Sequence, residues 1–209
     1  MAAEEKPSEA QVREINRQQR ELFDRLYRLF DPPLPEGVPG RLEQIAAAGR
    51  IRAGGTVLDV GSGTGILIPL IRSYHPARIY ACDLSPAMLA QLSRHYPRVR
   101  TLLADVRDLA LPDASIDVVF INACYPNIVD KPGAFANIAR MQKPAGRLVI
   151  SHPMGRAFIE RLKKSVPFPL DDFPRRNQAR KMLANYGFAV ESFVDEEELY
   201  ILTALKTSP

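Results

Sequence analysis

Cysteine is scarce in this chain of 209 residues. The two cysteines, Cys82 and Cys124, lie far apart in the sequence and show no metal-ligand spacing. We therefore expect neither a disulfide scaffold nor a metal site, and a reducing compartment fits this cysteine content.

Long apolar runs and a strong excess of one charge are also missing. No apolar run approaches the length that spans a bilayer, and the N-terminal segment MAAEEKPSEAQ lacks the apolar core of a signal peptide. We expect a cytoplasmic protein without a membrane partner. The net charge of +4 and the pI near 9.2 allow a nucleic-acid partner without requiring one, and the composition favours no particular oligomeric state.

The composition is that of an ordinary globular protein, with 46% hydrophobic and 25% charged residues, and the length suits one domain. Residues 1–10 are polar, and we expect them to be disordered. A helix is expected from about Ser8 to Phe30, because apolar residues between Val12 and Phe30 recur at helical spacing, and the prolines that follow end it. A second helix is expected near residues 40–49.

From residue 51 onwards, short apolar runs alternate with helical stretches. Strands are expected over residues 56–60, 78–82, 99–103, 117–122 and 147–151. Helices are expected between them over residues 66–73, 86–95 and 131–141, with a weak turn near 106–109. This alternation indicates a parallel sheet built from βαβ units.

The last part of the chain follows a different pattern. A helix over residues 175–186 precedes two β-rich runs, 188–194 and 199–206, which only four residues separate. Because so short a link cannot hold a helical crossover, we expect the two runs to form an antiparallel hairpin. The expected fold class is therefore α/β, with a mixed seven-stranded sheet that is mostly parallel.

A proline-rich segment, residues 152–174, follows the fifth expected strand. It belongs at the carboxyl edge of the sheet, where ligands bind in open α/β folds. We expect a helix near residues 155–164 within it. We interpret the segment as a substrate lid inserted in a core domain of residues 51–209, or alternatively as a structural connection.

The sharpest motif is VLDVGSGTG at residues 57–65, followed by the apolar ILI. Its order is strand, glycine turn, helix; the glycines permit positive φ and close approach of a ligand, and the helix N-terminus offers unpaired amides. A dinucleotide site needs its third glycine where Ile66 stands, and a P-loop needs a Gly-Lys-Ser/Thr sequence that does not follow here. A tight turn without a ligand is the structural alternative.

Three acids at successive strand ends point to a ligand class. Asp59 would repel a pyrophosphate but attract S-adenosylmethionine (SAM), which carries an ammonium and a sulfonium and no phosphate. Asp83 can accept hydrogen bonds from both ribose hydroxyls, or cap the helix after it. Asp105 can accept a hydrogen bond from the exocyclic amine of adenine, and Leu84 and Val106 would then cover the ring faces. Alternatively, Asp105 can cap a turn.

These segments resemble the class I SAM-dependent methyltransferases, which have a seven-stranded, Rossmann-like fold. The resemblance is carried by VLDVGSGTG, the acid of CDLS, ADVRDL, LPDASIDVVFINACYPNI, KPAGRLVISH and the closing hairpin. It looks closest to small stand-alone members that act on metabolites, and it implies SAM as the cofactor. The cofactor-binding residues that it implies are Asp59, Gly61, Ser62, Gly63, Gly65, Asp83, Leu84, Asp105, Val106 and Asn122.

The resemblance also assigns parts of the cofactor to these residues. Asp59 and the turn glycines would hold the methionine end, Asp83 the ribose and Asp105 the adenine, while Asn122 would border the methionine moiety. The segment around Tyr27 resembles the helix that often folds over SAM in such enzymes. Residues 11–50 are therefore expected to form N-terminal helices that cover the cofactor site, although their apolar stripe could equally be core packing.

Residues for the methyl acceptor are expected at the carboxyl ends of the fourth and fifth strands. His152 and Tyr125 are the candidates for catalysis, and Tyr27 and Arg156 are the candidates for substrate binding. His152 would act as a base or a hydrogen-bond donor, or be satisfied by a neighbouring loop. Cys124 is expected to be an inert thiol unless its site is electropositive.

The expected activity is in-line transfer of a methyl group from SAM to a small-molecule acceptor. Two alternatives stay open: an RNA or protein methyltransferase, indicated by the basic C-terminal half and by NACY at residues 122–125, and a non-catalytic SAM-binding protein. NACY lacks both prolines of the Asn-Pro-Pro-Tyr motif in enzymes that methylate amines of nucleic acids. A nucleic-acid partner is therefore not expected.

Overall fold

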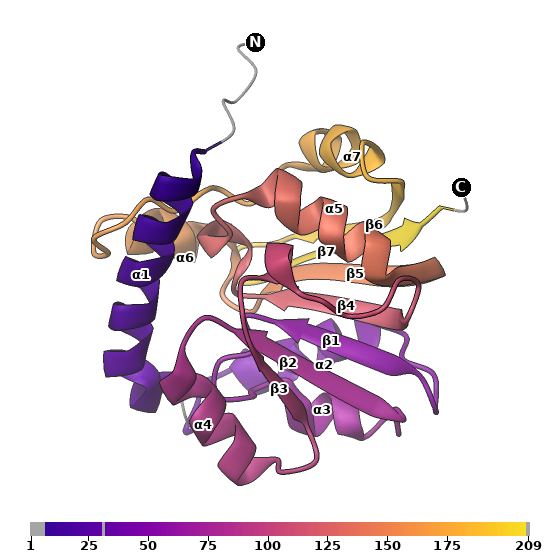
Figure 1. Cartoon of the computed structure of the whole chain (residues 1–209), viewed down its shortest axis with the longest axis horizontal. Coiled ribbons are helices and arrows are strands. Elements are labelled where there is room, and N and C mark those ends of the chain that lie inside the picture. Colours follow the sequence, from indigo (N-terminus) through magenta and orange to yellow (C-terminus); the bar gives the residue numbers. More distant parts are fainter. Residues whose placement is uncertain (1–6, 31, 208–209) are drawn as a thin grey trace.

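The computed structural model describes residues 7–30 and 32–207 (Figure 1). Residues 1–6 of the segment expected to be disordered lie outside this range. The expected end of that segment, residue 10, is wrong, because helix α1 (Glu9–Leu26) already includes Glu9 and Ala10. Ser8 and Gln11 form a capping box, in which each side chain accepts a hydrogen bond from the other residue's backbone N–H, and this satisfies two amides at the helix start.

In the described part of the chain, seven strands form a single sheet. Their bounds are β1 Thr56–Val60, β2 Arg78–Asp83, β3 Arg100–Leu103, β4 Ile116–Asn122, β5 Gln142–His152, β6 Phe188–Asp195 and β7 Tyr200–Lys206. Their spatial order is β3-β2-β1-β4-β5-β7-β6. Strand β7 runs antiparallel to its neighbours β5 and β6, and the other recorded pairs are parallel. The expected α/β fold class with a closing hairpin is confirmed.

Helices cover both faces of this sheet. Their bounds are α2 Val38–Ala48, α3 Ile68–Arg72, α4 Pro86–His95, α5 Lys131–Met141, α6 Gly155–Leu162 and α7 Arg176–Ala184, with short 3-10 turns η1 Tyr27–Phe30, η2 Val106–Asp108 and η3 Tyr125–Asn127. Helices α5 and α7 share a core with Leu58 and Val60, whereas α2 and α3 share one with Val57 on the opposite face (Figure 1). The alternation of side chains along β1 thus supplies both cores. None of the described helices is long and apolar enough to cross a membrane.

The chain reverses its direction of travel across the sheet between β1 and β4. Val60 of β1 lies opposite Cys82 of β2 and Ile121 of β4. The turn after β1 leads towards β2, whereas the loop after β4 leads towards β5 on the other side. Such a switch point opens a crevice at the carboxyl ends of the strands.

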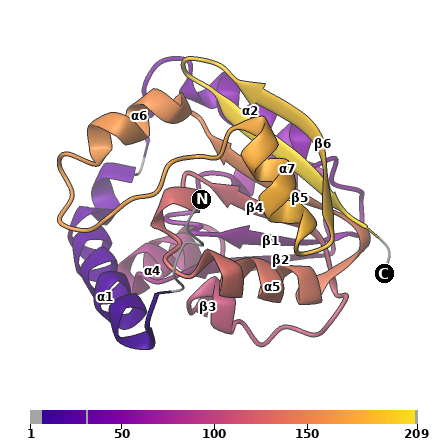
Figure 2. The same ribbon diagram turned by 90° about the horizontal axis from the view of Figure 1, so that it is seen from above.

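Helices α1 and α6 lie at the same end of the sheet in both ribbon views (Figure 2). The Asn16 side chain on α1 donates a hydrogen bond to Asp105, after β3, and the Gln19 side chain donates one to the Asn127 carbonyl, after β4. Helix α6 forms within residues 152–174 as expected, and the Tyr200 hydroxyl donates to the carbonyl at the end of this segment. Movement of the segment as a lid stays a prediction.

Candidate functional site

A cavity of about 360 Å³ lies at the carboxyl edge of the sheet, where the chain segments after β1 and β4 lead in opposite directions. Its walls come from α1 and η1, from the turn after β1, from the loops after β2, β3 and β4, and from the end of β5 with α6. A volume of this size is typical of small-molecule pockets. The cavity is therefore the candidate functional site.

The glycine turn after β1 forms one wall of the cavity. Gly61 and Gly63 line it with φ of +65° and +53°. A Cβ added at Gly61 would come within 2.2 Å of the Cys124 sulfur, so only glycine fits between the turn and the loop after β4. Gly65 has φ of +93° but faces Leu92 of α4 instead, where an added Cβ would come within 3.0 Å. Its role in this structure is packing.

Asp59 lies near the end of β1, lines the cavity and is only 2% exposed. Among the described residues no hydrogen bond or ion pair to its carboxylate is recorded, and burial together with the charge of Asp83 raises the pKa of Asp59 to about 8. Ser62, two residues into the turn, also lines the cavity with a buried hydroxyl that has no recorded partner. This wall therefore holds an acid whose charge the described residues do not balance.

Asp83 ends β2 and is held by the backbone. One carboxylate oxygen accepts a hydrogen bond from the Gly63 amide at 2.8 Å, and the other accepts one from the Ser85 amide at 2.8 Å. Burial raises the pKa of Asp83, and these backbone hydrogen bonds oppose the rise. Each oxygen keeps a second lone pair, so the fixed carboxylate can still accept two hydroxyl groups from a ligand.

Asp105 follows β3 and lines the cavity with Leu84 and Val106. The structure gives it a partner that the sequence did not reveal, because the Asn16 amide of α1 donates to one carboxylate oxygen at 2.7 Å. The other oxygen accepts from the Arg107 amide at 3.1 Å and so caps η2, which is the structural alternative considered above. Contact with adenine stays a prediction for Asp105, and Asn16 would share that carboxylate.

The end of β4 supplies two further cavity residues. Asn122 lines the cavity, and its side-chain oxygen accepts a hydrogen bond from the Ser151 hydroxyl of β5 at 3.0 Å. Cys124 also lines it, but burial and the nearby acids raise the pKa of its thiol. The thiol therefore stays protonated at neutral pH, in line with the inert role expected for it.

His152 is the last residue of β5 and lines the cavity beside Met154 and Phe158. Its Nδ1 accepts a hydrogen bond from the Met154 amide at 3.1 Å, and its ring packs against Phe158 and Phe173 with centroids 5.2 and 5.8 Å away. Burial lowers the pKa of His152 to about 4, so the ring is neutral at pH 7. With Nδ1 accepting, the remaining proton is on Nε2.

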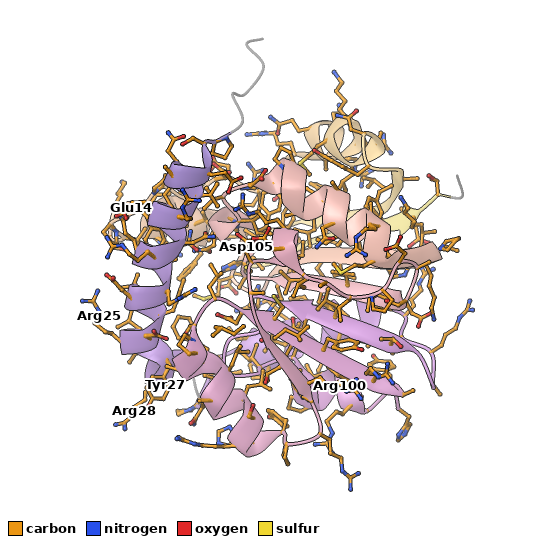
Figure 3. All side chains as sticks on the ribbon, viewed as in Figure 1. Glu14, Arg25, Tyr27, Arg28, Arg100 and Asp105 are labelled. Carbon is orange, nitrogen blue, oxygen red and sulfur yellow. The ribbon has the colours of Figure 1, made fainter. Side chains whose placement is uncertain are left out.

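Three residues expected at the acceptor site do not line the cavity. Tyr125 is 4% exposed and stacks on Phe173 in the core at 5.5 Å, because the turn η3 directs it inwards. Arg156 donates to Asp195 at 3.0 Å, at the end of β6. Tyr27 accepts a hydrogen bond from its neighbour Arg28 and follows the C-terminal end of α1, away from Asp105 (Figure 3).

Several cavity residues were not singled out from the sequence as site residues. They come from the N-terminal helices and from α6, and include Asn16, Gln19, Phe23, Phe30, Val38, Met154 and Phe158. The apolar stripe of residues 12–30 was a usable signal for Phe23 and Phe30, since core packing and cover of the cavity were both considered for it. Gln19 occupies a position of the same stripe, whereas Asn16 gave no signal, because polar helix positions usually face water.

The residues present fit SAM. The two buried acids Asp59 and Asp83 have no Lys or Arg partner among the described residues, and a ligand that carries an ammonium and a sulfonium would balance them. A pyrophosphate would bring further negative charge to the same wall. The open turn at Gly63, where the nearest atom to an added Cβ is 3.9 Å away, leaves room for close approach.

Comparisons with known proteins agree with this geometry. Residues 58–150 match the family model described as a methyltransferase domain. Over 99 residues the chain is 37% identical to a malonyl-[acyl-carrier protein] O-methyltransferase of Halorhodospira halophila; this alignment covers 46% of the chain and 34% of that enzyme. Over 114 residues it is 34% identical to a demethylmenaquinone methyltransferase of Tropheryma whipplei; this alignment covers 52% of the chain and 46% of that enzyme.

The fold is shared over nearly the whole chain with a solved magnesium protoporphyrin IX methyltransferase from Synechocystis PCC 6803. The TM-score is 0.68 at 18% identity, covering 92% of this chain and all of the other. The alignments with the two curated relatives thus span less than half of either enzyme, whereas the fold matches a complete structure. Residues 58–150 thus match a methyltransferase domain, and the chain has the seven-stranded, Rossmann-like fold of solved methyltransferases.

Proposed function

We propose that this chain binds SAM along the ends of β1, β2 and β3 and transfers the methyl group to a small molecule held in the same cavity. The observation that carries the proposal is Asp59, a cavity acid that is 2% exposed and whose charge the described residues do not balance. A bound cation would stabilise its ionised form. The adjoining cavity of about 360 Å³ supplies the space for ligands.

The chain's own residues would bind and orient the two reactants. Asp59 and the amides of the glycine turn would hold the amino-acid end of SAM, and Asp83 would accept its ribose hydroxyls. Leu84 and Val106 would flank the adenine. When bound, SAM supplies a methyl group activated by the positive charge on its sulfur.

Water would be excluded from the reacting end of the cavity by apolar side chains. Phe23 and Phe30 line it from the N-terminal helices, and Phe158 lines it from α6. Fixing two reactants in line within such an enclosure can supply much of the rate of a displacement reaction. His152, neutral at pH 7, would help to orient the acceptor.

The test is a transfer assay with purified protein and SAM labelled with tritium in the methyl group. The proposal predicts that label moves to small organic acceptors and that the demethylated product, S-adenosylhomocysteine (SAH), accumulates in step. The names of the relatives suggest two acceptors for the first panel, a malonyl thioester and a demethylated quinone. Label in RNA or protein would overturn the acceptor class, and tight SAM binding without transfer to any acceptor would favour the non-catalytic alternative.

A further inference from the structure

The charged residues of the cavity all have the same sign. Its lining includes Asp59, Asp83 and Asp105, and among the described residues no lysine or arginine side chain lines it. All three acids lie at the ends of β1 to β3, on the side assigned to the cofactor. The remaining wall, which would face the acceptor, therefore offers no cation to an anionic group, and burying an unpaired anion there would be costly.

The acceptor side of the cavity is built mainly from apolar side chains. Phe23, Phe30 and Val38 contribute from the N-terminal helices, and Met154 and Phe158 contribute from the segment after β5. Phe30 is 43% exposed, so apolar surface continues to the mouth of the cavity. Such a surface gains free energy by covering apolar rings or chains.

Several polar side chains that line the cavity form hydrogen bonds within the protein. Asn16 donates to Asp105, Gln19 donates to the Asn127 carbonyl, and the Asn122 oxygen accepts from Ser151. These bonds pair one end of each side-chain amide, and no hydrogen bond from the Asn122 side-chain nitrogen is recorded among the described residues.

His152 has one ring nitrogen with a recorded partner and one without. Its Nδ1 accepts from the Met154 amide at 3.1 Å, and no hydrogen bond to Nε2 is recorded among the described residues. Because the neutral ring then carries its proton on Nε2, it presents a fixed N–H donor and no lone pair at that atom. Phe158 and Phe173 hold the ring from two sides. The tautomer thus favours hydrogen-bond donation over action as a base.

We propose that the methyl acceptor is an uncharged, largely apolar molecule that offers one oxygen atom to the Nε2–H of His152. This inference rests on the proposed function in treating the ligand as a methyl acceptor. The ligand preference of the cavity can nevertheless be measured without turnover. Two probes with the same ring system separate the cases: 2-naphthol is neutral at pH 7, and 2-naphthoate is an anion. Naphthalene is the third probe, because it has the ring and no oxygen.

Fluorescence titrations should be made with and without saturating SAH. The expected result is at least about 10-fold tighter binding of 2-naphthol than of 2-naphthoate, since an unpaired buried charge costs more than a kilocalorie per mole. Equal or tighter binding of 2-naphthoate would overturn the inference. Failure of SAH to bind would count against the proposed function alone, because the probe preference is also measured without SAH.

Variants test the two walls separately. His152→Phe keeps an aromatic ring and removes the donor, so 2-naphthol should bind about 3- to 10-fold more weakly while naphthalene is unaffected. An equal loss for both probes would show that His152 acts only through packing, which contradicts the donor role. Met154→Lys places a cation at the cavity wall and should raise the affinity for 2-naphthoate.

A matched pair controls for general destabilisation. Phe158→Ala removes a half-buried ring that lines the cavity and should weaken 2-naphthol binding. Phe193→Ala removes a half-buried ring on β6 that does not line it and should leave 2-naphthol binding unchanged. The same loss in both variants would contradict the placement of the acceptor in this cavity.

Discussion

Asp59 lies in surroundings that oppose its charge. In the folded chain its pKa is about 8, whereas an aspartate in an unfolded chain titrates near 4. Between these values the folded state binds the extra proton, so the contribution of Asp59 to the free energy of unfolding falls as the pH rises. The Asp59 carboxylate therefore weakens the ligand-free protein most above pH 8.

Asp59→Asn should remove this pH-dependent loss. We expect urea unfolding to show the variant gaining stability over the unmodified chain between pH 5 and pH 8.5 by at least about 1.4 kcal/mol, the equivalent of one pKa unit. Asp113→Asn changes an exposed carboxylate, 77% accessible, and should follow the pH profile of the unmodified chain. Parallel profiles for Asp59→Asn and the unmodified chain would rule out the raised pKa.

Gly61 and Gly63 share positive φ but differ in their surroundings. Gly63→Ala should cost about 1–2 kcal/mol of backbone strain, because its added Cβ meets no atom closer than 3.9 Å. Gly61→Ala should cost about 1–3 kcal/mol more, because its Cβ overlaps the Cys124 side chain at 2.2 Å. Thermal unfolding gives both values, and Cys124→Gly should rescue part of the loss in Gly61→Ala. Equal destabilisation by the two alanines would refute the close approach.

At this scale, the sequence predicted residues whose environment follows from their place in a strand. Asp59 and Asp83 occupy the cavity wall because each stands at the carboxyl end of a parallel strand. The partner of Asp105 could not be predicted, since Asn16 precedes it by 89 residues and lies on a helix whose docking depends on tertiary packing. Tyr125 could not be placed either, because the direction of its ring depends on the turn η3.

Among the elements, α1 is attached to the rest of the molecule by polar contacts as well as by apolar packing. Its Asp24 carboxylate accepts hydrogen bonds from the Ser85 hydroxyl and from the Ala87 amide at the start of α4. A negative charge at a helix N-terminus is favourable there, and the bonds satisfy amides that lack partners in the helix. Asp24 therefore couples α1 to α4 beside the cavity.

Asp24→Ala should loosen this attachment. A loss of about 1 kcal/mol would make the amides of α1 exchange with deuterium about 5-fold faster. Glu21→Ala is the matched control, because Glu21 is an exposed carboxylate on the same helix that pairs with Arg17 four residues away. Exchange that is equally fast in both variants, or unchanged in Asp24→Ala, would show that Asp24 does not hold α1.

The elements themselves were predictable where periodicity and end signals agree. Helices α4 and α5 have the bounds expected from the sequence, since each follows a capping residue and has a proline in its first two positions. Helix α1 starts at Glu9, close to the start expected near Ser8, and Ser8 and Gln11 form a capping box there. Strand β5 starts at Gln142, five residues early, because its first residues pair with the start of β4, and such pairing depends on tertiary contacts.

For the whole molecule, the order of the strands determines where the acids meet. Alternation of strands and helices predicted parallel βαβ units, and the short final link predicted the antiparallel hairpin. The resulting switch point brings Asp59, Asp83 and Asp105 to one cavity although they are spread over 47 positions of the chain. We propose that these acids select a cationic nucleoside, SAM, as the ligand.

Calorimetric titration of SAM into the unmodified chain and into Asp83→Ala tests this claim most directly. Loss of one charge-assisted hydrogen bond is worth about 1.5–3 kcal/mol, so we expect the variant to bind SAM about 10- to 150-fold more weakly. Asp113→Ala, far from the cavity wall, should bind like the unmodified chain. Unchanged SAM affinity in Asp83→Ala, or tighter binding of NAD than of SAM by the unmodified chain, would show that these acids do not select SAM.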